Sequence, residues 1–109
     1  MKLPANAIIV REKATHYLLV PQARGDKSGF LELAGYSRED PDQLLRDLRL
    51  QLLLDAVPTK SNRFGQYYEI RGSLTGANGV RLAVRTVWMT EHLSGVTRFV
   101  TLLPDKRRT

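Results

Sequence analysis

The chain has 109 residues, of which 42% are hydrophobic and 26% are charged, a composition typical of one folded domain rather than of a disordered segment. It contains no cysteine, which excludes disulfide bonds, thiolate metal sites and cysteine nucleophiles. No segment approaches the roughly 20 apolar residues of a membrane span, and no apolar signal segment opens the chain. We therefore expect a single cytoplasmic domain over residues 1–109 that has no membrane partner.

The net charge of +6 belongs entirely to the second half of the chain. Residues 1–55 contain eight basic and eight acidic side chains, whereas residues 56–109 contain nine basic and three acidic ones. A basic half beside a neutral half indicates one positive face, and polyanions such as RNA are the usual partners of such a face. The alternative is ordinary surface charge that aids solubility. Residues 105–109 are predicted to form a solvated basic tail.

The first 40 residues predict two short helices. Residues 11–20 carry apolar side chains at helical spacing, and Pro21 ends this pattern. Asp26 then stands where it can cap a second short helix.

The best-marked helix is predicted over residues 41–55. Asp40 precedes a proline, and Gln43 lies three residues after Asp40, which is the arrangement of a capping box. Leucines recur at helical spacing, and Leu50 and Leu54 widen the apolar face. We interpret this face as core, with a partner-binding surface as the alternative.

From residue 64 onward the apolar pattern changes from helical to alternating. Three strands are predicted, over residues 64–74, 80–89 and 97–103. Helices followed by an antiparallel meander are typical of an α+β fold. We therefore predict an α+β fold in which two short helices and one long helix pack on an antiparallel meander of three to four strands.

The apolar pattern also predicts the register of the first hairpin. A three-residue loop over 77–79, with its last glycine left-handed, pairs Leu74 with Leu82 and collects the apolar side chains on one face. A two-residue loop would mix apolar and charged side chains on both faces. On the other face, the preferred register places Arg71 directly opposite Arg85.

This second face predicts a phosphate site. Glu69 lies next to Arg71 and Arg85, and two guanidiniums beside one carboxylate can hold a phosphate and move a proton near it, as RNA cleavage requires. Lys27 stands at a predicted helix start, where an ammonium and helix amides can meet an anion. Glu69 or His16 is the candidate proton acceptor. The alternative for the sheet residues is a solvated strand face with a surface ion pair.

Further arginines are candidates for binding the nucleic acid. We expect Arg24, Arg81 and Arg98 to contact phosphates, because guanidiniums suit them. The sequence has no P-loop, no dinucleotide fingerprint and no zinc-ligand spacing, so no metal and no cofactor is predicted.

Several short strings are characteristic when taken together: Lys2-Leu3-Pro4, Asp26-Lys27-Ser28, Gly72-x-Leu74-Thr75-Gly76-x-Asn78-Gly79, Arg85-Thr86-Val87-Trp88 and Val100-Thr101. They resemble a family of uncharacterised bacterial domains that is similar to the small ribonuclease toxins of the barnase, colicin and RelE-like group. The resemblance directs attention to Lys27, Arg85, Thr86 and Thr101 as site residues. Relatives carry a histidine in the turn before the lysine, but residues 22–25 of this chain contain none, so the resemblance leaves the general acid or base unassigned.

Three functions follow as hypotheses. The first is a small metal-independent endoribonuclease, the toxin of a toxin–antitoxin or polymorphic toxin system, which cleaves RNA and has a small acidic antitoxin or immunity protein as partner. The second is a non-catalytic basic module that binds nucleic acid or an acidic protein. The third is a structural or immunity-type partner protein that uses the leucine-rich helix as its interface.

Overall fold

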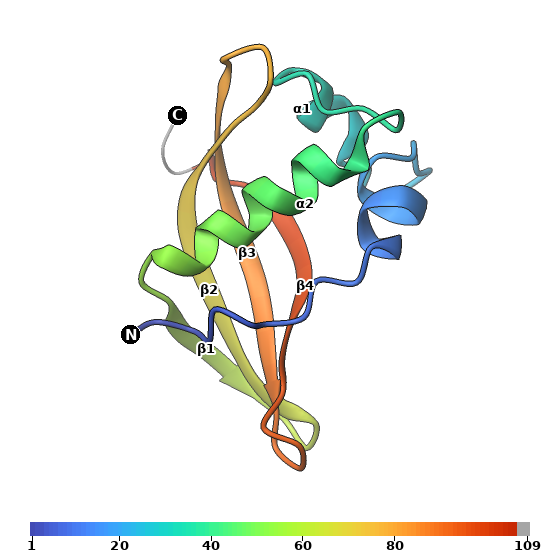
Figure 1. Ribbon diagram of the computed structural model, residues 1–109. Coiled ribbons are helices and arrows are strands. Elements are labelled where there is room, and N and C mark those ends of the chain that lie inside the picture. The colour runs from blue at the N-terminus through green and yellow to red at the C-terminus, as the bar shows by residue number, and fades with distance from the viewer. Residues whose placement is uncertain (107–109) are drawn as a thin grey trace.

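The computed structural model describes residues 1–106 and is built around one four-stranded antiparallel sheet (Figure 1). The strands follow one another in the order β1-β2-β3-β4, and they comprise β1 (Val57–Ser61), β2 (Gly65–Thr75), β3 (Arg81–Glu91) and β4 (Thr97–Pro104). Four helical segments precede the sheet in the chain, and they comprise the π-helix η1 (Ala14–Leu18), α1 (Ser28–Glu32), α2 (Pro41–Leu50) and the 3₁₀-helix η2 (Gln51–Leu53).

The helical segments and the N-terminal segment cover one face of the sheet. In Figure 1, α2 lies across this face, and the N-terminal segment, drawn in blue, crosses the same face below α2. The sheet side chains beneath them are buried and are Ile70, Leu74, Leu82, Val84, Thr86, Trp88, Phe99 and Leu102. Burial of one large apolar side chain stabilises the folded state by roughly 1.5–3 kcal/mol. The covered face, where these side chains are buried together, is therefore the hydrophobic core. In the part of the chain that the structure describes, no helical layer covers the opposite face of β2 and β3.

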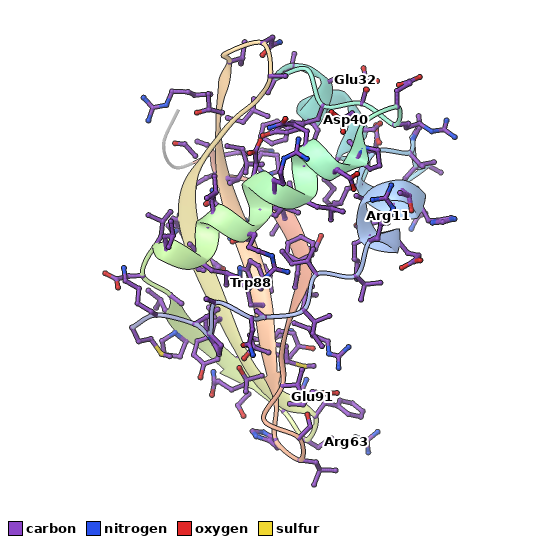
Figure 2. All side chains as sticks on the ribbon, in the orientation of Figure 1. Arg11, Glu32, Asp40, Arg63, Trp88 and Glu91 are labelled. Atoms are coloured by element: carbon purple, nitrogen blue, oxygen red, sulfur yellow. The ribbon has the colours of Figure 1, made fainter. Side chains whose placement is uncertain are left out.

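Trp88 lies at the centre of this core, below α2 in the view of Figure 2. Its ring meets Phe99 edge to face, with centroids 5.3 Å apart and an angle of 73° between the planes. Its indole N–H donates a hydrogen bond of 2.8 Å to Oγ1 of Thr86. Because Thr86 is fully buried on the covered face, it is a packing residue and lies outside any solvent-facing site.

The predicted register of the β2–β3 hairpin is confirmed. Leu74 pairs with Leu82, and Arg71 pairs with Arg85. Gly79 adopts a φ of 84°, the left-handed conformation that closes this loop at no steric cost in a residue without Cβ.

The predicted fold is wrong in its helices. Of residues 11–20, only 12–18 are helical, and within them Ala14–Leu18 form a wide π-turn closed by the Leu19 N–H donating to the Ala14 carbonyl at 3.1 Å. Both Leu18 and Leu19 are buried, so their packing takes precedence over regular α-helical spacing in this segment.

Within residues 1–106, no helix is long and apolar enough to cross a bilayer.

The long helix predicted over residues 41–55 is also wrong, because α2 ends at Leu50 and the chain then tightens into η2. Gln51 is buried and its side-chain amide donates to the carbonyl of Ser73 on β2 at 3.0 Å, which draws the chain toward the sheet. Leu50 and Leu54 are 57% and 39% exposed, so they do not widen the buried face of the helix.

The start of α2 has the predicted proline but lacks the predicted capping box. Asp40 makes no side-chain capping hydrogen bond. Gln43 instead donates from its amide to Asp47 at 2.9 Å, and the same carboxylate oxygen accepts the hydroxyl of Tyr36 at 2.6 Å. The glutamine therefore takes part in packing the helix and does not close its first turn.

The structure contains a strand, β1, that the alternating pattern of the sequence does not predict. All five of its residues are exposed, so it carries no alternation of buried and exposed side chains. It lies at the edge of the sheet, where Pro58 is tolerated because an edge strand has one unpaired side.

The predicted solvated tail is wrong at Asp105. Asp105 is buried and accepts a hydrogen bond of 3.0 Å from Nη1 of Arg71. Lys106 is exposed, and residues 107–109 lie outside the described part of the chain. The end of β4 is therefore part of the packed domain.

Gly76 provides a test of how closely the hairpin meets the helical layer. A Cβ at this position would lie 1.8 Å from the Ala34 carbonyl oxygen, so we expect Gly76→Ala to destabilise the fold by about 1–3 kcal/mol. A Cβ at Gly29, within α1, would meet nothing within 4 Å, so Gly29→Ala should stabilise by about 0.5–1 kcal/mol. Urea denaturation measures both, and equal free energies of unfolding for the two variants would contradict the close approach.

Candidate functional site

The uncovered face of the sheet carries a cluster of opposite charges. Arg71 and Arg85 lie directly opposite each other on β2 and β3, with side chains 34% and 30% exposed. Glu69 lies between their charges, with Oε1 3.4 Å from Nη2 of Arg71 and Oε2 3.5 Å from Nη1 of Arg85. One carboxylate therefore offsets the repulsion of two facing guanidiniums.

Asp105 adds a second carboxylate to this cluster. Its side chain is fully buried, and its Oδ1 lies 3.0 Å from Nη1 of Arg71. Arg71 is thus paired with carboxylates on both sides, which fixes the orientation of its guanidinium.

A cleft of about 500 Å³ opens beside the arginines and is called the central cleft below. Its lining consists of Gly25, Asp26, Lys27, Arg71, Arg85, Leu103, Pro104, Asp105 and Lys106. Four of these side chains are basic and two are acidic, which gives the lining a net charge of +2. A partly enclosed site with this charge is suited to bind a phosphate group.

Two further clefts each share one lining residue with the central cleft, and the three together are called the open groove below. One has a volume of about 500 Å³ and is lined by Val10, Glu12, Lys13, Tyr17, Lys27, Val100 and Thr101. The other has a volume of about 400 Å³ and is lined by Asp55, Val57, Thr59, Glu69 and Arg71. Lys27 lines the first of these clefts as well as the central one, and Arg71 lines the second as well as the central one, so the three clefts adjoin one another between β4 and β1.

The loop that carries Lys27 is held by its own hydrogen bonds. The backbone N–H and the hydroxyl of Ser28 donate to Oδ1 of Asp26 at 3.1 and 2.7 Å, and they hold the pKa of that carboxyl below its usual value. Nζ of Lys27 donates to the hydroxyl of Tyr17 at 3.0 Å. These contacts direct the ammonium toward the groove.

Five predicted catalytic residues line the open groove. Lys27, Arg71 and Arg85 meet in the central cleft. Glu69 lines the neighbouring cleft on the β1 side, and Thr101 lines the one beside η1. Residues that are 74 positions apart in the sequence are therefore brought to one groove.

The remaining candidates lie elsewhere. Arg24 and Arg81 are exposed outside the lining of the three clefts. Arg98 pairs with Glu91 at 3.0 Å. A hydrogen bond from Ser94 and, to a smaller extent, this contact with Arg98 lower the pKa of Glu91. His16 is exposed, with Nδ1 2.8 Å from the hydroxyl of Thr15, and it is not among the lining residues. Glu69 is therefore the better placed of the two candidate proton acceptors.

Tyr17 and Lys106 are among the lining residues that the sequence prediction did not include. Tyr17 is assigned there to the apolar face of a helix, yet its hydroxyl meets Lys27 in the groove. Lys106 is assigned to a solvated tail, yet it lines the central cleft. A hydroxyl on an otherwise apolar face was the available signal for the tyrosine, whereas nothing local distinguishes the lysine from a tail residue.

The domain thus consists of a four-stranded antiparallel sheet with helical segments on one face and a cationic groove on the other. By sequence, residues 2–106 match the family described as a domain of unknown function, DUF6883, and the chain belongs to this family. No curated protein matches the chain in sequence.

The same fold occurs in a solved bacterial structure. The chain is similar to a chain of a contact-dependent growth inhibition toxin–immunity protein complex from Klebsiella pneumoniae 342, with a TM-score of 0.67 and 16% sequence identity. The similarity covers 94% of this chain and 96% of that chain. At this identity the similarity concerns the fold.

Phosphate binding tests the central cleft independently of any reaction. We expect inorganic phosphate to raise the melting temperature, because a ligand that binds only the folded state stabilises it. Arg85→Gln should abolish most of this increase. Arg38→Gln removes the same charge from an exposed position outside the groove lining and should retain it.

The comparison of these two variants also separates binding from a general salt effect. Phosphate is excluded from protein surfaces and stabilises many proteins without a site. Equal increases in melting temperature for Arg85→Gln and Arg38→Gln would therefore contradict a phosphate site in the central cleft. Sodium chloride at equal ionic strength serves as the second control.

Proposed function

We propose that this chain is a small endoribonuclease whose active site is the open groove. The observation that carries the proposal is the convergence of Lys27, Arg71 and Arg85 on one cleft, with Glu69 paired to both arginines. Because guanidinium and ammonium groups supply the positive charge, the proposed chemistry is metal-independent. The reaction is attack of a ribose 2′-hydroxyl on the neighbouring phosphate.

Each side chain has a role in this proposal. Arg85, Arg71 and Lys27 bind the scissile phosphate and stabilise the charge that develops on its oxygens in the transition state. Glu69 accepts the proton of the 2′-hydroxyl as general base. Its ion pairs hold the carboxylate close to the position where the phosphate would bind.

We propose further that the protein acts as the toxin of a toxin–immunity or toxin–antitoxin pair, with cytoplasmic RNA as its substrate. The similarity in fold to a chain of a toxin–immunity protein complex supports this proposal. The expected partner is a small acidic protein that covers the cationic groove, because complementary charge favours such a contact. Arg24, Arg81 and Arg98 stay proposed contacts to RNA segments outside the groove.

Expression in a bacterium tests the proposal. Induction of the wild-type chain should arrest growth and fragment total RNA, whereas Arg85→Ala should do neither. Arg38→Ala, which removes an arginine outside the groove lining, should behave as the wild type. Purified wild-type protein should leave 2′,3′-cyclic phosphate ends, and Glu69→Gln should reduce the cleavage rate about 100-fold or more because general base catalysis is lost.

Three outcomes would contradict the proposal. If Arg85→Ala folds and cleaves RNA as the wild type does, the active site lies elsewhere. Intact RNA in every culture would exclude ribonuclease activity. RNA that binds to the purified chain in a salt-dependent way without being cleaved would instead identify a non-catalytic nucleic-acid-binding module.

A further inference from the structure

Tyr17 lies at the end of the open groove beside β4, and it has no role in the function proposed above. Nζ of Lys27 donates to its hydroxyl at 3.0 Å, and the same ammonium lies 5.3 Å from the centroid of its ring. Lys27 also lines the central cleft with Arg71 and Arg85. One lysine therefore connects the phenol to the proposed phosphate site.

The surroundings of Tyr17 favour loss of its proton. The hydrogen bond from Lys27 lowers the pKa of Tyr17, burial opposes this, and a hydrogen bond to Thr101 and the charges of Lys27 and Lys13 lower it further. Glu12 is the acidic side chain in the same lining. The phenol is thus a stronger acid than an exposed tyrosine, and the ammonium of Lys27 stabilises the phenolate that forms.

The sheet register places Thr101, which lines the same cleft as this phenol, two strands away from Glu69. Glu69 pairs with Val87 on β3, and Val87 pairs with Thr101 on β4, which lines the same cleft as Tyr17. Since neighbouring strands are about 4.8 Å apart, the backbones at Glu69 and Thr101 are about 10 Å apart. Arg85 lies on β3, two residues from Val87, between the strand that carries Glu69 and the strand that carries Thr101.

This arrangement matches the requirement of displacement at phosphorus. The attacking and leaving oxygens lie roughly in line, on opposite sides of the phosphorus atom. A general base and a general acid must therefore stand on opposite sides of the phosphate. Glu69 lines a cleft on the β1 side of Arg85, and Tyr17 lines a cleft on its β4 side.

We propose that Tyr17 is the general acid of the reaction and protonates the leaving 5′-oxygen. This role depends on the ribonuclease function proposed above. Glu69 takes the proton of the 2′-hydroxyl, the 2′-oxygen forms a bond to phosphorus, and the bond from phosphorus to the 5′-oxygen breaks. The 5′-oxygen keeps the electron pair of that bond and takes the phenolic proton. The products are a 2′,3′-cyclic phosphate and a free 5′-hydroxyl, and proton exchange with water restores both side chains.

A change of leaving group tests this role. The substrate is an oligonucleotide that spans a site cut by the wild-type chain in total bacterial RNA, made once with the normal linkage and once with sulfur replacing the bridging 5′-oxygen. A thiolate leaves without a proton, so only the oxygen substrate needs the acid. We expect Tyr17→Phe to slow cleavage of the oxygen substrate about 100-fold or more and to leave the sulfur substrate within about threefold of the wild type.

A second tyrosine provides the matched control. Tyr67 also has a lysine over its ring, with Nζ of Lys60 5.0 Å from the centroid, and it lies outside the lining of the groove. Tyr67→Phe should cleave both substrates at the wild-type rate. Circular dichroism and the melting temperature establish that both variants are folded.

The pH profile provides a second readout. The rate at which the wild type cleaves the oxygen substrate should fall at alkaline pH, as Tyr17 loses its proton. Because the pKa of Tyr17 is lowered, this fall should occur at a lower pH than an exposed tyrosine would give. Cleavage of the sulfur substrate should not show this fall. A change of phosphate binding with pH would affect both substrates, so the difference between their profiles reports the acid.

The possible failures are distinguishable. Equal losses on both substrates for Tyr17→Phe would mean that the hydroxyl serves binding or structure, and no loss on the oxygen substrate would mean that it has no role. Both results overturn the proposal for Tyr17 and leave the ribonuclease in place. If the folded wild-type chain cleaves no RNA, the ribonuclease function fails and the role of Tyr17 fails with it.

Discussion

The register of the β2–β3 hairpin is the constraint on which the rest of the structure depends. Successive side chains of a strand point to opposite faces, so a slip of one residue would place Ile70 on the same face as Arg85 and Arg71 on the other. One of the two strands would then turn its charged side chains toward α2. The observed register instead places apolar side chains against the helical layer. It also places two guanidiniums directly opposite each other on the uncovered face, so their repulsion has to be offset nearby.

The carboxylates that offset this repulsion also shape the groove. Glu69 contacts both arginines, and Asp105 contacts Arg71 from the buried end of β4. The charges are therefore organised before any ligand binds, which is the condition under which electrostatic stabilisation of a transition state is effective. In the proposed reaction, Glu69 both keeps the arginines together and removes a proton, so stability and activity depend on the same carboxylate.

The fold by itself leaves the activity open, because one fold can carry many unrelated functions. The similarity to a chain of a toxin–immunity complex extends over nearly the whole domain at 16% identity, and the family has no assigned function. The functional argument therefore depends on the groove. There, a lysine from the first third of the chain, two arginines of the central hairpin and a threonine of the last strand line adjoining clefts.

The sequence by itself determined the three long strands and the hairpin register, because alternation of apolar side chains is a local property and burial of one face enforces it. It did not determine where the helical segments end or which polar groups meet. The long helix stops where Gln51 bonds to Ser73, and the cationic groove is completed where Lys27 meets Tyr17 and where Asp105 is buried. These contacts join segments that no local pattern relates, and they exist only when the sheet and the helical layer pack together. Tertiary structure alone therefore decided that the face with the arginines is open to solvent.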